Sequence, residues 1–255
     1  MPILMYHQVS AIPAREFRRY TVTVKEFARQ MRWLAASGYR AIDLDTFARA
    51  RRGETGLPDR PVVITFDDGF QGCADHAVPV LRSRGFTAVF YVVSGHVGGT
   101  SAWMRATLGI ELPLMSWETV RSLAAEGFEI GAHTVTHPRL TELDRAHCRA
   151  ELVNARRRIE AEVGRPAAHL AYPFGAYNAT VRELADEAGY LTACSTRPGL
   201  SDAADDRLAL HRVNVYGHDS LLDFAFRVRL GTSLGERMAR ALGRMTGRLR
   251  PSARP

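Results

Sequence analysis

Residues 61–70 read PVVITFDDGF, an apolar run followed at once by two aspartates and a glycine. The run is typical of a strand that is buried on both faces of a parallel sheet. Two adjacent ionised carboxylates, Asp67 and Asp68, repel each other, and a cation or a shared proton is the usual way to hold such a pair. Since consecutive side chains of an extended segment point in opposite directions, we expect the two aspartates to have different roles.

Similar apolar runs follow helical patterns that end at glycine, at Gly38, Gly85, Gly127 and Gly189. Glycine just after a helix adopts the left-handed conformation that other residues resist, so these positions are predicted helix-to-strand joints. Thr23, Ser116 and Asn178 are predicted to cap the starts of three helices. Four further runs, at 3–7, 61–66, 169–172 and 207–215, bring the count to about seven or eight strands.

Strands that alternate with helices predict an α/β fold with a parallel sheet, and a chain of 255 residues favours a closed or distorted barrel over an open sheet. No Pro/Ser/Gly-rich linker divides the chain. We therefore expect one catalytic barrel over residues 1–230 and a basic, amphipathic tail over residues 231–255.

Chemically capable residues follow several predicted strands. In such barrels the active site lies at the carboxyl ends of the strands, so these residues are expected to meet at one rim. They are His7, Asp67, Asp68, His133 and the segment 173–175.

The stretch HTVTH places His133 and His137 four residues apart, which suits a shared metal if the segment forms a helical turn. Pro138 excludes the middle of a long helix. A zincin protease would need Glu where Thr134 stands. Two histidines and one aspartate leave open coordination positions, as a catalytic metal site requires. The alternative is a pair of unrelated loop histidines, which the Asp-Asp pair on another strand end disfavours.

At this point the chain resembles a known family. TFDDG at 65–69, HTVTH at 133–137 and YPFG at 172–175 are similar to the first three motifs of the polysaccharide deacetylases, the NodB-homology domain of carbohydrate esterase family 4. The similarity covers about 220 residues and leaves only the tail. It implies a distorted (β/α)7-type barrel, in agreement with the alternation of strands and helices.

The resemblance also implies roles for individual residues. Asp68, His133 and His137 would bind a divalent metal, most commonly Zn2+, with Co2+, Ni2+ or Fe2+ as alternatives. Asp67 would be the general base. The third motif would contact substrate, with an oxyanion on the Phe174 amide; core packing is the alternative role for Tyr172. The members of that motif are Tyr172, Pro173, Phe174 and Gly175.

Two positions depart from the family pattern. An arginine that orients the base often begins the third motif, but Ala171 stands here; YHQV and AYPFG resemble the subgroup with the bacterial poly-N-acetylglucosamine deacetylases. The last motif, which supplies a general acid, could be LALH with His211, or the alignment could place Arg212 there. His7 is the rival for the acid or for a substrate contact.

Charge is concentrated near the end of the chain, where residues 227–255 hold eight Arg and one Glu and account for the formal net charge of +7. The body therefore offers no electrostatic argument for nucleic-acid binding. The tail would either pack on the barrel as a helix or attach to an anionic membrane surface or a phosphorylated substrate. The three cysteines lack the spacing typical of disulfides or thiolate zinc sites. Together with the absence of a signal-peptide pattern, this predicts a cytoplasmic protein. The protein would be peripheral to the membrane if the tail binds it.

The leading hypothesis is a metal-dependent hydrolase that removes N-acetyl groups from an N-acetylglucosamine-type sugar in a glycan or glycoconjugate. One alternative is a deacylase of a polyprenyl-linked or small-molecule amino sugar at the membrane surface. Another, from a different class, is a non-catalytic carbohydrate-binding barrel, for which Ala171 and the unassigned acid argue.

Overall fold

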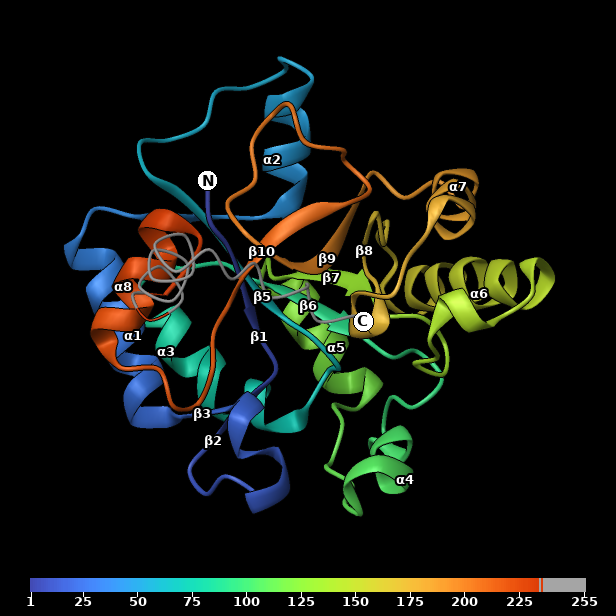
Figure 1. Ribbon diagram of the computed structural model, residues 1–255, viewed down its shortest axis with the longest axis horizontal. Helices are drawn as coiled ribbons and strands as arrows, with labels where there is room; N and C mark the ends of the chain where they lie inside the picture. The colour runs from blue at the N-terminus through green and yellow to red at the C-terminus, as the bar shows by residue number, and fades with distance from the viewer. Residues whose placement is uncertain (234, 236–255) are drawn as a thin grey trace, which may run out of the picture.

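The computed structural model describes residues 1–233 and 235 and contains a closed barrel of seven parallel strands. The predicted (β/α)7-type barrel is confirmed (Figure 1). Its strands, in order around the barrel, are β1 (Ile3–Tyr6), β10 (Leu210–Asn214), β9 (Thr192–Pro198), β8 (His169–Ala171), β7 (Glu129–Ala132), β6 (Val89–Val92) and β5 (Pro61–Phe66), with β5 pairing back to β1.

Three short strands lie outside this ring. β4 (Arg40–Ile42) pairs with the first half of β5, and β6 takes over along the same strand from Thr65 onward. β2 (Gln8–Ser10) and β3 (Thr21–Thr23) form a separate parallel pair. Because β1 joins β5 on one side and β10 on the other, the barrel closes through the first strand of the chain.

Helices cover the outside of the barrel, and their predicted start and stop signals are confirmed. Thr23, Ser116 and Asn178 each accept a backbone N–H through their side chains. The glycines at the four predicted joints have φ between 64° and 92°. The α-helices are α1 (Val24–Ala36), α2 (Leu44–Arg51), α3 (Val78–Arg82), α4 (Arg105–Leu108), α5 (Trp117–Ala125), α6 (Arg145–Val163), α7 (Ala179–Glu187) and α8 (Leu221–Leu230). The shorter helical segments are η1 (Arg15–Tyr20), η2 (Cys73–Ala77), η3 (Ala102–Met104), η4 (Leu140–Glu142) and η5 (Pro173–Gly175).

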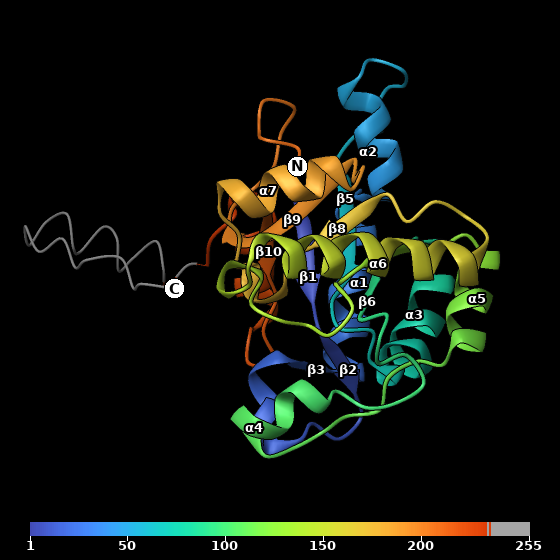
Figure 2. The same ribbon diagram turned by 90° about the vertical axis from the view of Figure 1, so that its right-hand side faces the viewer.

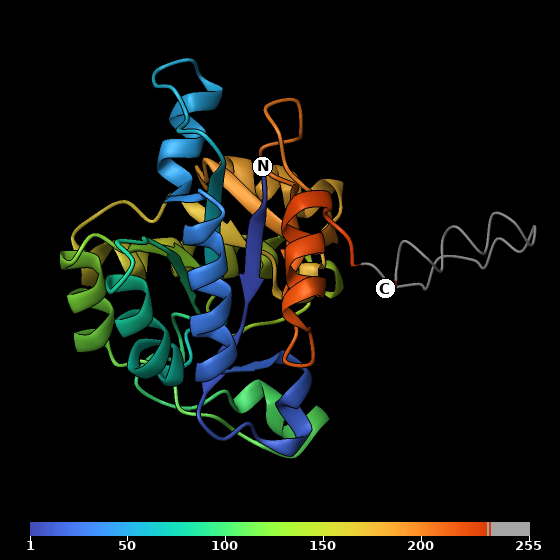
Figure 3. The same cartoon turned by 90° about the vertical axis from the view of Figure 1, so that its left-hand side faces the viewer.

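The two ends of the barrel differ. β1 runs from the end near α2 to the end where β2, β3 and α4 lie (Figure 1, Figure 2). All barrel strands are parallel, so their carboxyl ends meet at the β2–β3 end. Figure 3 shows α1 and α8 side by side outside β1, where Trp33 packs edge-on against Phe224 at 5.8 Å.

Alternation along β5 determines which of its side chains enter the barrel. Val63 belongs to the cluster that fills the interior, whereas Val62 and Ile64 belong to the cluster packed under the helices. Side chains alternate between the two faces of a strand, so Thr65 and Asp67 follow Val63 on the inner face. The interior cluster includes Ile3, Val63, Val89, Tyr91, Ala171, Cys194 and Leu210.

Part of the predicted tail cannot be compared with the structure, because residues 234 and 236–255 lie outside the described part. The three cysteines are free and buried. Within the described part, none of the helices combines the length and apolar character needed to span a bilayer.

The interior of the barrel leaves no room for a larger residue at Gly131 in β7. A methyl group there would overlap the Tyr91 ring and come within 3.0 Å of the His169 carbonyl oxygen. Gly131→Ala should cost about 1–3 kcal/mol of folding free energy through overpacking. We expect a lower thermal midpoint by circular dichroism, by roughly 2–4 °C per kcal/mol. Gly56→Ala is the control, because its added methyl meets nothing within 4 Å; equal midpoints in the two variants would contradict this account.

Candidate metal centre and active site

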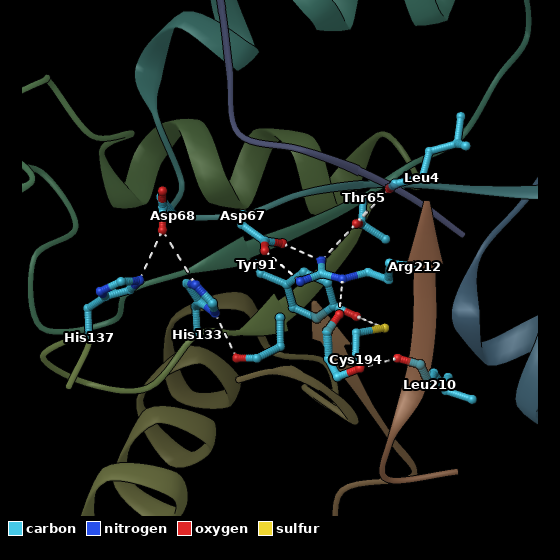
Figure 4. A network of polar contacts seen from close by, with 12 residues as sticks. Leu4, Thr65, Asp67, Asp68, Tyr91, His133, His137, Cys194, Leu210 and Arg212 are labelled. Atoms are coloured by element: carbon cyan, nitrogen blue, oxygen red, sulfur yellow. Dashed lines mark hydrogen bonds and ion pairs between the residues drawn. The ribbon is translucent and has the colours of Figure 1, made fainter. Parts of the chain in front are cut away.

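Asp68, His133 and His137 come together at the carboxyl ends of β5 and β7. Oδ1 of Asp68 lies 3.4 Å from Nε2 of His133 and 3.2 Å from Nε2 of His137 (Figure 4). All three side chains are buried. Their potential ligand atoms lie within 4.8 Å of one another, so the three residues predicted as ligands form a single cluster.

The donor atoms of this cluster fit a divalent metal of the zinc type. Two imidazole nitrogens and one carboxylate oxygen converge on one point, and such a set leaves positions for water and substrate. Burial alone raises the pKa of Asp68, but hydrogen bonds from His133 and His137 hold it well below its ordinary value. An ionised carboxylate beside two imidazoles is the form that binds a cation.

The carbonyl of Ala171 fixes the orientation of His133. Nδ1 of the ring lies 2.7 Å from that oxygen, and a carbonyl oxygen can only accept, so Nδ1 carries a hydrogen. Nε2 is the ring nitrogen that faces Asp68 and would bind a metal once it has lost its proton. Residue 171 thus contributes to the site through its backbone, although it lacks the arginine side chain of the family pattern.

The segment that carries the two histidines is a loop and not the helical turn suggested by their spacing. Residues 133–137 form no helix, and Thr134 and His137 have φ of 66° and 61°. Asp68 and Phe174 are also left-handed, at 73° and 58°. Four of the five described non-glycine residues with positive φ therefore lie in the three motifs, where a strained backbone aims the functional groups.

Arg212 supplies the guanidinium that Ala171 lacks. Its Nη1 and Nη2 donate to the two oxygens of Asp67, each at 2.7 Å (Figure 4). The sequence analysis considers Arg212 only as an alternative alignment of the last motif and does not predict its pairing with Asp67. The available signal was an arginine in the middle of a predicted strand, LHRVN.

Two further hydrogen bonds fix the guanidinium. Nε donates to the carbonyl of Ser195 at 2.8 Å, and Nη1 donates to Oγ1 of Thr65 at 3.1 Å. Burial raises the pKa of Asp67, and the Arg212 charge and hydrogen bonds lower it by more, so the net pKa lies below the ordinary value. Asp67 is thus ionised at neutral pH and held in one orientation.

The structure corrects the assignment of His211 as general acid. His211 and Arg212 are consecutive in β10 and point to opposite faces; Arg212 enters the barrel, so His211 leaves it. The imidazole lies against Gly199, and the backbone N–H of His211 donates to the Ser201 hydroxyl at 2.8 Å. Its ring is therefore on the wrong side of the strand.

His7 lies at the predicted rim. It follows β1 directly, and its ring packs 5.0 Å from the Tyr20 ring. Burial lowers the pKa of His7, while the charges of Asp68 and Asp67 raise it by less. The structure therefore brings His7 into the electrostatic environment of the two aspartates.

The third motif is divided between core and site. Tyr172 is fully buried, stacks on Tyr177 at 5.1 Å and donates its hydroxyl to the Leu208 carbonyl, so it packs in the core and does not face substrate. Pro173 is also buried. Gly175 has φ of 67°, and a methyl there would collide with Thr196.

The remaining member, Phe174, faces solvent beside the Asp-His-His cluster. Its side chain is 50% exposed, and its ring lies 4.7 Å from the His137 ring. Trp103, from the long loop after β6, stacks on His137 from another direction at 4.7 Å. The guanidinium of Arg139 lies 4.4 Å from the Phe174 ring. An aromatic and cationic wall thus borders the cluster.

Comparison with known proteins identifies relatives of this chain. The chain matches the sequence model of the family described as Polysaccharide deacetylase over residues 54–193. The Bacillus subtilis protein YxkH, named as a polysaccharide deacetylase, is 27% identical over 215 residues, which cover 84% of this chain and 71% of YxkH. The poly-beta-1,6-N-acetyl-D-glucosamine N-deacetylase of Escherichia coli K12 is 31% identical over 126 residues, which cover 48% of this chain and only 19% of that enzyme.

Solved structures share the fold. The deacetylase PplD of Streptococcus pyogenes, solved in complex with acetate, has a TM-score of 0.76 at 23% identity, covering 87% of this chain and 94% of PplD. IcaB from Ammonifex degensii has a TM-score of 0.75 at 23% identity, covering 90% of this chain and 96% of IcaB.

These findings confirm the predicted fold and the predicted enzyme class of a carbohydrate deacetylase, in a family that depends on a metal. The family match covers more than half of the chain and includes the Asp-Asp pair and the two histidines. This chain therefore belongs to the polysaccharide deacetylase family.

Proposed function

We propose that this protein hydrolyses the N-acetyl group of an N-acetylglucosamine-type sugar in a glycan, with Asp67 as general base. The observation that carries this proposal is the separation of the two adjacent aspartates. Asp67 is paired with Arg212 inside the barrel, and Asp68 faces the two histidines. One carboxylate is thus available for proton transfer beside a site that can hold a metal.

The reaction requires water to attack the acetyl carbon. Asp67 accepts a proton from that water as the new C–O bond forms. The C–N bond then breaks, the nitrogen takes a proton from an acid, and acetate and the free amine leave. Relatives with this chemistry include the poly-N-acetylglucosamine deacetylase above and a chitooligosaccharide deacetylase from Rhizobium leguminosarum bv. trifolii, 29% identical over 167 residues that cover 62% of this chain and 70% of that enzyme.

Zinc is the metal that we assign to Asp68, His133 and His137, because two imidazoles and a carboxylate are the usual ligands of catalytic zinc. Co2+, Ni2+ and Fe2+ can use the same donor set. A divalent ion held there would polarise the acetyl carbonyl and acidify water.

His7 is our candidate for the general acid. It is a described histidine outside the Asp-His-His cluster, and the charges of both aspartates act on the pKa of its ring. It comes from β1, next to β5, and so lies on the side of Asp67 away from the β7 histidines. We assign the oxyanion contact to the backbone N–H of Phe174 and a sugar contact to its exposed ring.

Membrane attachment and a lipid-linked substrate are proposals that depend on residues outside the barrel. The predicted peripheral contact depends on residues 231–255, nearly all of which lie outside the described part. We therefore propose a glycan substrate first and keep the lipid-linked sugar as a second substrate class, to be separated by assay.

The metal ligands and the base should give different phenotypes. Asp68→Ala should abolish both zinc binding and acetate release, because it removes the only carboxylate of the cluster. Asp67→Asn should retain zinc and lose about 10²–10⁴-fold in kcat. Zinc binding is measured by calorimetry. Acetate release is measured with N-acetylglucosamine oligomers and with lipid-linked sugars as substrates. Full activity in a zinc-free Asp68→Ala variant would refute the proposal; glycan binding without acetate release by the zinc-loaded wild type would support a non-catalytic barrel.

Arg212 should be irreplaceable by lysine. Arg212→Lys keeps the positive charge but cannot donate to both oxygens of Asp67 in a planar pair. We expect kcat to fall about 10- to 100-fold through misorientation of the base, with KM little changed. The exposed pair of Arg182 with Asp206 provides the control Arg182→Lys, which should leave kcat unchanged. Equal kcat in both variants would contradict the orienting role.

Parallel substitutions of His7 and His211 can show which of the two is the general acid. An acid must hold its proton, so kcat/KM of the wild type should fall as the pH rises through the lowered pKa of His7. His7→Gln should lose about 10²–10⁴-fold in kcat and this alkaline limb, while zinc affinity is retained. His211→Gln should leave the pH profile intact. The reverse pattern would restore His211 as the acid.

A further inference from the structure

The loop of residues 133–137 supplies two of the three metal ligands and is not part of a regular element. Thr134 and His137 both hold left-handed backbone conformations, at φ of 66° and 61°. Non-glycine residues keep such conformations only where surrounding contacts enforce them. The position of the ligands therefore depends on what anchors this loop.

The two histidines differ in how their rings are held. His133 follows β7 directly, and its Nδ1 is bound to the Ala171 carbonyl. Nδ1 of His137 has no hydrogen-bond partner among the described residues, and its ring is held by packing against Trp103 and Phe174. The placement of His137 thus relies more on the loop backbone than that of His133 does.

Glu151, in the first half of α6, anchors that backbone. Its Oε2 accepts the N–H groups of Val135 at 2.8 Å and Thr136 at 3.0 Å, and its Oε1 accepts the Thr136 hydroxyl at 2.7 Å. An ionised carboxylate that accepts several hydrogen bonds forms stronger bonds than a neutral acceptor does. A single side chain thus fixes two consecutive peptide groups between the metal ligands.

The opposite edge of the loop is held through its carbonyl oxygens. The carbonyls of Thr134 and Val135 accept N–H groups from Ser94 at 3.0 Å and Gly95 at 2.8 Å, in the loop after β6. A Cβ at position 95 would collide with the Val135 carbonyl, so glycine permits this close approach. The loop lies between a fixed backbone edge and the Glu151 carboxylate.

We propose that Glu151 is a positioning residue of the metal centre, which sets metal affinity by holding the 133–137 backbone and thereby His137. This inference rests on the proposed metal site. Glu151 contacts the loop between the ligands, outside the three sequence motifs. Its removal leaves the donor set intact but lets the left-handed loop relax away from the geometry that brings the ligand atoms together.

The test is a zinc titration of the purified full chain by calorimetry at 25 °C, with a competing chelator where binding is tight. Glu151→Ala should weaken zinc affinity about 10- to 100-fold, as outer residues that orient metal ligands do. Glu151→Gln should restore most of it, because the amide oxygen can accept the two N–H groups and the Thr136 hydroxyl can accept from the amide nitrogen. Glu162→Ala, on the same helix and paired at 2.8 Å with Arg121 on the surface, should bind zinc like the wild type.

A purely structural role would give a different result, with a lower thermal midpoint for Glu151→Ala but an unchanged zinc affinity at 25 °C, and that result would overturn the inference. If Glu151→Ala does not fold, Thr136→Val removes only the hydroxyl contact and should weaken zinc binding in the same direction by a smaller factor; an unchanged affinity again overturns it. A wild type that binds no zinc would overturn both this inference and the proposed function, whereas equal affinities in the wild type and Glu151→Ala overturn this inference alone.

Discussion

The buried pair of Arg212 and Asp67 is the interaction on which the site depends. Their side chains are 0% and 3% exposed, and removing one partner of such a pair typically costs about 3–5 kcal/mol, because the other charge is left buried and uncompensated. Asp67 follows β5 and Arg212 belongs to β10, the two neighbours of β1. The pair therefore joins the strands on either side of the point where the barrel closes, and Thr65 links it to β1 by donating to the Leu4 carbonyl at 2.8 Å.

The same pair explains how two adjacent carboxylates can coexist at a buried strand end. Asp67 continues the inner face of β5 and has its charge balanced by a guanidinium. Asp68 has a φ of 73°, which turns the chain out of the strand and aims its carboxylate at His133 and His137. Each aspartate thus has its own cationic or metal-binding partner, and the repulsion that a shared site would cause is avoided.

Local rules predicted much of this molecule, and non-local contacts account for what they missed. Glycine at helix ends, capping residues and apolar runs each act within a few residues, so the barrel could be predicted from them, and the resemblance to the deacetylase motifs implied the Asp-His-His cluster. The partner of Asp67 lies 145 residues away, and its identity depends on which side chain of β10 enters the barrel. The register of β10 against β9 shifts between Leu210 and Arg212, so counting positions along the strand could not decide between His211 and Arg212.

The two histidines lie together as predicted, although the local structure predicted from their spacing is wrong. Four residues separate His133 and His137, which would align them on a helix, yet they converge through a loop with two left-handed residues. A helical turn would be held by its own backbone hydrogen bonds, whereas this loop needs partners from elsewhere in the chain. The N–H groups of Val135 and Thr136 go to Glu151, and the carbonyls of Thr134 and Val135 go to Ser94 and Gly95. The loop that carries both histidines is therefore held by α6 and the loop after β6, and a sequence pattern limited to the histidines cannot reveal these contacts.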